Sequence, residues 1–273
     1  MAKGKDQNPE VTMSLLEHLE VLRWHLIRSF ISIIIVAILA FLFHGIIFDK
    51  ILLAPMSPEF ITNKLFCVFG KVVNTPALCI NASPFNIINI QMSGQFVIHI
   101  TVSIIAGFII AFPYIIFEFW QFIKPALFKH ERKHAKGFVF FSSLLFFLGV
   151  LFGYYVIVPL SVNFLGTYSV SDQVVNQINL SSYISIVNSV TLAGGIVFEL
   201  PILIYFFTKI GLITPDFLRK YRKHSLVVLL ILSAIITPPD VFSQILVCFP
   251  LVILYEIGIV ISKRIVKKEE RDI

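Results

Sequence analysis

Residues 93–117 of this chain read SGQFVIHITVSIIAGFIIAFPYIIF. They lie inside a longer stretch, 72–117, that contains no Asp, Glu, Lys or Arg. A helix that crosses the hydrocarbon core of a bilayer needs ~20 mostly apolar residues. A water-soluble fold has no place to bury so long an uncharged run, whereas a bilayer does. The stretch therefore predicts a transmembrane helix and an integral membrane protein.

Further apolar runs repeat this pattern, and the whole chain is 57% hydrophobic and only 14% charged. We expect an all-α membrane protein, a single polytopic domain over 1–273, with six spans at about 24–48, 93–117, 137–159, 183–207, 224–236 and 241–262. The last two runs are short, since thirteen residues of helix (224–236) reach only ~20 Å. Bilayer thinning or cover from neighbouring helices would accommodate them. Residues 49–91, which contain four prolines, predict a long irregular loop, and the polar residues 160–182 predict a second loop.

The basic residues give an orientation. Of 22 Lys and Arg residues, 19 lie in the N-terminal segment, in the loops after the second and fourth spans, and in the C-terminal tail. The other three, Lys50, Lys64 and Lys71, lie in the loop 49–91. The positive-inside rule then predicts that both termini are cytoplasmic and that 49–91 is on the opposite side. The net charge of +6 is thus typical of juxtamembrane anchors and does not indicate nucleic-acid binding. The first run is a full span, so we expect no cleaved signal peptide.

Glu131 lies between the second and third spans, in a segment that matches a zinc-protease motif by letter. His130-Glu131-Arg132-Lys133-His134 fits His-Glu-x-x-His, in which two histidines bind zinc and the glutamate acts as a base. The surrounding lysines and arginines oppose a dication, and no third ligand is obvious. We therefore expect no metal site, and the plainer interpretation is a basic membrane anchor in which Glu131 neutralises its neighbours.

Glu20 lies in a short amphipathic segment before the first span. Ser14 and Glu17 have the spacing of a capping box, which predicts a helix beginning at Ser14. Glu20 is then on the polar side, opposite a stripe of leucines. The segment indicates an interfacial helix, and a simply solvated face is the alternative.

Glu199 is a carboxylate inside the fourth span. Placing a charge at the centre of a bilayer costs at least ~2.5 kcal/mol on insertion scales. Gly194, Gly195 and Pro201 loosen the helix around it. We expect a functional polar site here, with a structural hydrogen bond to a neighbouring helix as the alternative.

Four other polar residues are candidates with strong structural interpretations. Asp240 follows two prolines and has the position of a helix N-cap at a turn, and Gln244 is one turn deeper, where it could contact another helix. Cys67 and Cys79 are twelve residues apart in the loop 49–91. On an oxidising face they could form a disulfide, and two unrelated thiols are the alternative.

Taken in order, several segments resemble the twin-arginine translocase subunit TatC family. The segments that carry the resemblance are His18-Leu19-x-x-Leu22-Arg23, Ala54-Pro55, Phe122-Ile123-x-Pro125-Ala126-Leu127-x-Lys129-His130-Glu131-Arg132, Phe198-Glu199-x-Pro201 and Thr237-Pro238-Pro239-Asp240-Val241-Phe242-Ser243-Gln244. Each alone is a weak signal, but together they run through most of the chain. We expect Pro55 and Asp240 to lie at structural turns.

The resemblance implies a receptor and no enzyme or cofactor. It implies a core subunit of an oligomeric translocase in the bacterial cytoplasmic (inner) membrane, which binds signal peptides with paired arginines and exports folded proteins. It also implies single-span partners of the TatA and TatB type. The chain contains no Gly-x-x-x-x-Gly-Lys-Ser/Thr nucleotide-binding loop either.

The resemblance also assigns the signal-peptide site. It places Glu131 in the arginine site, with Arg23, Phe122 and Pro125 beside it. The family's second acid falls at Val21 in this chain, and Glu20 is one residue earlier, which rotates the side chain ~100° around a helix. Glu199 and Gln244 are implied to contact partner helices within the membrane.

Two other functions remain open from sequence alone. A secondary transporter would use Glu199 as a proton or ion site, and it would show inverted repeats with paired broken helices. An assembly scaffold would use the same acidic residues to bind partner subunits only.

Overall fold

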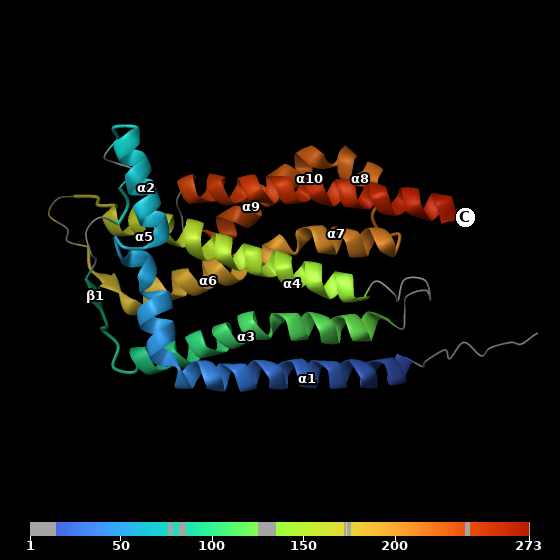
Figure 1. The fold of residues 1–273 in the computed structure, drawn as a ribbon, viewed down its shortest axis with the longest axis horizontal. Helices are drawn as coiled ribbons and strands as arrows, with labels where there is room; N and C mark the ends of the chain where they lie inside the picture. Colours follow the sequence, from blue (N-terminus) through green and yellow to red (C-terminus); the bar gives the residue numbers. More distant parts are fainter. Residues whose placement is uncertain are drawn as a thin grey trace, which may run out of the picture.

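The computed structural model describes residues 15–75, 79–81, 86–124, 135–171, 173, 176–237 and 241–272. Helices contain 83% of the described residues. Its long helices run side by side, with the pair α1 (Leu15–Leu42) and α3 (Gly94–Ile123) at one edge and α10 (Val241–Asp272) toward the other (Figure 1). Between them lie α4 (Ala135–Phe152), α6 (Leu180–Phe198) and α7 (Leu200–Lys209). The short α8 (Pro215–Lys220) and α9 (Arg222–Ile236) pack on α10.

Within the described residues, five helical stretches are long and apolar enough to cross a membrane. They are Leu19–Leu42, Gly94–Ile123, Gly137–Thr167, Leu180–Lys209 and Ser243–Lys267. The predicted all-α membrane class is therefore confirmed. Helix α9 coincides with the predicted fifth span but has only 15 residues, which reach ~22 Å.

Two helices extend beyond the predicted spans. The third helix does not end at residue 159, because a π-helical turn, Gly153–Ile157, leads from α4 into α5 (Val158–Thr167). Residues 160–167 were assigned to a loop for their polarity, yet the polar groups there have partners. Ser161 Oγ donates to Ser243 Oγ at 3.2 Å, and Asn163 Oδ1 accepts from the backbone N of Asn81 at 2.9 Å. The last helix likewise continues past residue 262 to Asp272.

The centre of the bundle is a close contact between α4 and α6. A Cβ atom on Gly149 would lie 2.3 Å from the carbonyl oxygen of Gly194, and one on Gly153 would lie 2.9 Å from that of Val190. Small residues let membrane helices approach backbone to backbone, and Gly149 and Gly153 have the spacing typical of such contacts. Tyr183 of α6 is fully buried, and its hydroxyl donates to the carbonyl oxygen of Leu52 at 2.6 Å.

The sequence predicted an irregular loop at 49–91, but the structure shows regular elements there. A π-helical turn (Ile46–Leu52), a 3-10 turn (Ala54–Met56) and the helix α2 (Ile61–Val72) form most of its first half. Figure 1 shows α2 running across the ends of the long helices. The prolines mislead here because Pro55 starts a turn rather than breaking a helix, and its buried carbonyl accepts from Asn63 Nδ2 at 2.9 Å.

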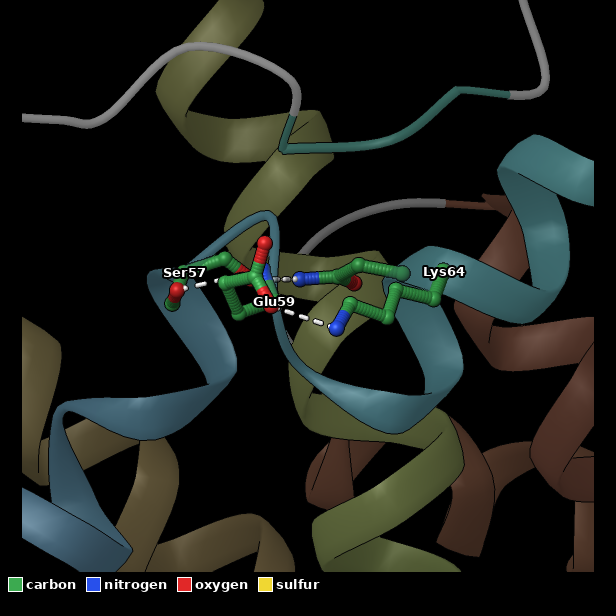
Figure 2. A network of polar contacts seen from close by, with 4 residues as sticks. Ser57, Glu59 and Lys64 are labelled. Atoms are coloured by element: carbon green, nitrogen blue, oxygen red, sulfur yellow. Dashed lines mark hydrogen bonds and ion pairs between the residues drawn. The ribbon is translucent and has the colours of Figure 1, made fainter.

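Three further contacts fix this end of the molecule. Figure 2 shows one of them, where Lys64 pairs with Glu59 and the backbone N of Glu59 donates to Ser57 Oγ. A two-residue parallel pairing joins β1 (Ile87–Ile88) to β2 (Ile178–Asn179), so the two loops at this end meet. Cys67 and Cys79 are joined by a disulfide.

Candidate functional site

The beginning of α1 carries two of the predicted binding residues. Glu20 and Arg23 are both exposed, whereas Val21 is half-buried one turn before His25. The face of α1 that contains Val21 and His25 is the one that turns toward α3. The structure thus separates Glu20 from the position where the family's acid would lie.

A buried carboxylate occupies the facing turn of α3. Glu118 is 3% exposed, and its Oε2 lies 2.5 Å from Nδ1 of His25. Phe122, one turn further along α3, is half-buried and meets the His25 ring edge-on, with ring centroids 6.4 Å apart. The ends of α1 and α3 are therefore joined by an acid-imidazole contact with an aromatic cover.

Glu118 was missed in the sequence because it directly follows the uncharged stretch 72–117 and was taken as its boundary. Its position in the last two turns of a 30-residue apolar helix was the available signal. An ionisable residue within a transmembrane segment indicates function until a structural role is shown. The partner of Glu118 is 93 positions away in the sequence, which no local pattern reveals.

Three predicted site residues, Pro125, Glu131 and Asp240, lie outside the described residues. Helix α3 ends at Ile123, and the described residues stop one position later, at Lys124. Glu20, Arg23 and Phe122 are therefore the members of the predicted arginine site that the structure places.

Glu199 lies where one helix stops and the next begins. It is the residue between α6 and α7, and Pro201, which lacks a backbone N–H, is in the first turn of α7. Its Oε2 accepts from the buried hydroxyl of Ser142 in α4 at 2.8 Å. Its Oε1 is buried without a hydrogen-bond partner among the described residues. The structural alternative of a hydrogen bond to a neighbouring helix is thus observed for one oxygen, and the other remains an available acceptor.

Gln244 contacts its neighbouring helix rather than pointing into an empty face. Its Nε2 donates to the carbonyl oxygen of Leu230 in α9 at 3.2 Å. The side chain is half-buried, so the amide ties the first turn of α10 to α9.

Glu20 and Glu118 differ in what they leave available to a ligand. Glu20 is an exposed carboxylate, and a guanidinium can bind both oxygens of a carboxylate at once. Glu118 is buried and already paired with His25.

The fold and its apolar helices define a multi-pass membrane protein. The chain belongs to the TatC family: residues 17–250 match the sequence profile of "Sec-independent protein translocase protein (TatC)". It is thus a subunit of the machinery for Sec-independent protein translocation, a transport protein that works in a complex with other subunits.

Individual relatives and a solved structure are also TatC proteins. The chain is 44% identical to the Sec-independent protein translocase protein TatC of Blattabacterium sp. subsp. Periplaneta americana (strain BPLAN) over 96% of this chain and 100% of the relative. It is 35% identical to the TatC of Aquifex aeolicus (strain VF5), over 94% of this chain and 98% of the relative. A crystal structure described as "Twin Arginine Translocase Receptor- TatC" superposes with a TM-score of 0.70 at 35% identity, covering 90% of this chain and 98% of that one.

Proposed function

We propose that this chain is the signal-peptide receptor of a twin-arginine translocase and that it binds the paired arginines at the shared end of α1 and α3. The observation that carries this proposal is the contact between two segments far apart in sequence. The α1 segment with Glu20 and Arg23 and the α3 end with Phe122 are joined through the pair His25–Glu118. The resemblance assigned both segments to one site, and their adjacency supports a common ligand.

The three glutamates have different roles in this proposal. Glu131 is the principal partner of the peptide's guanidinium groups, and Glu20 is a second, exposed partner. Glu118 acts as a positioning residue, because its pairing with His25 fixes α1 relative to α3. Val21, where the family has an acid, leaves the half-buried side of the site without a free carboxylate.

We also propose the orientation and span number that complete this function. The chain crosses the membrane six times, with α9 as the short fifth crossing, as one polytopic domain. Both termini and the acid-bearing end then face the bacterial cytoplasm, where signal peptides arrive. The basic residues at that end support this orientation.

Partner subunits of the TatA and TatB type are proposed to dock along the membrane-exposed helices. The free Oε1 of Glu199 supports a polar contact inside the bilayer with an inserted signal peptide or a partner helix. Gln244 would stabilise the α9–α10 edge on which a single-span partner packs.

The test is a comparison of signal-peptide binding with paired arginines and with paired lysines to the detergent-solubilised chain. We expect the arginine peptide to bind more tightly by ~1–3 kcal/mol, because a fork-shaped donor pairs bidentately with a carboxylate. Glu131→Ala should remove the preference, and Glu20→Ala should reduce it.

Glu59→Ala is the matched control, since it removes one exposed carboxylate at the opposite end of the molecule. If the control weakens binding as much as Glu131→Ala, the effect is one of overall charge and the assigned site is wrong. Equal affinity of the wild-type chain for both peptides would also contradict the receptor function.

A further inference from the structure

A basic cavity lies between α8, α9 and α10, apart from the α1–α3 site. Its volume is about 370 Å³. Five cationic side chains line it: Arg219, Arg222, Lys263, Arg264 and Lys267. Figure 1 shows how this arises, with α8 lying alongside the C-terminal half of α10.

The cations of this cavity are only partly neutralised by the described part of the protein. Glu256 is the one carboxylate in the lining, and its Oε2 is held by Arg222 Nη2 at 2.6 Å. The other four cations have no carboxylate partner among the described residues. The lining therefore has five positive charges against one negative charge, a net of +4. Like charges gathered around one cavity attract an anion, most strongly where the surroundings are partly apolar.

An apolar track leads along α10 to the cavity. Its members recur at helical spacing and are each at least 45% exposed: Phe249, Ile253, Ile257 and Val260. The last of them, Val260, is also part of the cavity wall, and Arg264 follows one turn later. A helix that spans a membrane presents such a track to acyl chains.

We propose that this cavity binds the phosphate headgroup of an anionic phospholipid whose acyl chains lie along the α10 track. Basic pockets between helices at a membrane surface are suited to phosphate-bearing headgroups, and arginine can bind a phosphate through two parallel hydrogen bonds. The position of the track favours a lipid over a free phosphate ion, because a free ion would gain nothing from Phe249 or Ile253. The neighbouring short helix α9 gives a bound lipid a structural use, since it would fill the edge where the protein is thinner than the bilayer.

The test uses the full chain, delipidated in a neutral detergent. Phosphatidylglycerol, diphosphatidylglycerol, phosphatidylcholine and inorganic phosphate are added separately, and bound lipid is counted by native mass spectrometry while Tm is followed. A ligand that binds only the folded chain raises Tm. We expect retention and a higher Tm with the two anionic lipids, and neither with phosphatidylcholine or phosphate.

The variant Lys263→Gln with Arg264→Gln removes two of the cations. We expect anionic lipid affinity to fall about 30-fold, from the contribution of each cation near a membrane surface. The matched control is Lys64→Gln with Lys71→Gln, which makes the same charge change on exposed residues of α2, and it should bind as the wild type does. The swap Lys263→Arg with Arg264→Lys keeps both charges and should retain binding, which separates charge loss from misfolding.

Three results would overturn the proposal. The first is equal retention of phosphatidylcholine, and the second is unchanged affinity in the double Gln variant. The third is a rise in Tm with inorganic phosphate that matches the rise with anionic lipid, which would make the cavity a site for a soluble anion.

Discussion

The first and third membrane helices differ in how much of their surface is buried in the protein. Of the apolar window in the first span, 6% of the residues are buried in the protein, compared with 50% in the third. Helix α1 packs mainly against α3, whereas α4 packs against α6 in the middle of the bundle. Among the five apolar stretches of the described residues, the one that contains Glu20 and Arg23 is thus the least buried in the protein.

The contacts that hold these two helices also differ in kind. Gly149, Gly153 and Gly194 bring the backbones of α4 and α6 together along a seam that leaves no room for a side chain. Helix α1 is held by one close approach, at Gly107, and by polar contacts near its two ends. These are His25 with Glu118, and His99 Nε2 with the carbonyl oxygen of Phe41 at 3.1 Å. A ligand can replace side-chain contacts with contacts of its own, but it cannot replace a close contact between two backbones. We therefore expect α4 and α6 to be held rigidly and α1 to be able to shift.

The largest effect on stability is expected at Gly149, where α4 and α6 approach most closely. Gly149→Ala would place a methyl group 2.3 Å from the carbonyl oxygen of Gly194 and force α4 away from α6. We expect a loss of ~3 kcal/mol or more in the free energy of unfolding. Thermal and denaturant unfolding in detergent would measure it. Gly137→Ala, on the same helix with no atom of the described residues within 4 Å of the added Cβ, should not lower stability. Similar losses in both variants would remove the seam as the explanation.

A smaller loss of stability is expected at Gly107, where α1 meets α3. Gly107→Ala brings a methyl group 2.8 Å from the carbonyl oxygen of Ile33, but α1 can move outward because lipid covers its other sides. We expect ~1–2 kcal/mol under the same unfolding conditions. A loss as large as that of Gly149→Ala would show that α1 is held as rigidly as the centre.

The pair at the end of α1 should matter more for binding than for stability. Glu118→Gln keeps a hydrogen-bonding group beside His25 but removes the charge, and we expect ~1 kcal/mol of stability to be lost. Preference for the twin-arginine peptide should fall too, because α1 is no longer fixed in place. The conservative variant Glu118→Asp, measured in parallel, keeps the charge and shortens the side chain. It therefore tests whether the peptide preference depends on the charge or on the length of the side chain. Unaltered peptide preference in Glu118→Gln would restrict the pair to a purely structural role.

The smallest effect is expected at Gln244. Gln244→Ala removes a single hydrogen bond to α9, and interhelical hydrogen bonds in membranes contribute ~0.6 kcal/mol on average. Stability should therefore barely change, while crosslinking to a single-span partner subunit should decrease if this edge is a docking surface. Undiminished crosslinking would separate Gln244 from partner binding.

The five long apolar helices were predictable because a bilayer imposes length and polarity on every helix that crosses it. What the sequence could not reveal are contacts between distant segments. The helix through Ser161 and Asn163 was read as loop, because the partners that satisfy these polar groups, Ser243 and Asn81, are both 82 positions away. Helix α2 is not evident from sequence because the prolines around it suggest an irregular loop, whereas Pro55 forms a 3-10 turn before the helix. Glu118 looked like the boundary of a span until His25 was seen beside it.

The disulfide between Cys67 and Cys79 has a meaning for biogenesis. A bacterial cytoplasm keeps thiols reduced, whereas the opposite face of the membrane is oxidising. In the proposed orientation the bond between Cys67 and Cys79 can form only after both cysteines have crossed the bilayer, and a chain inserted the other way round would keep two free thiols. The redox state of these two cysteines would then report the direction in which the chain entered its membrane.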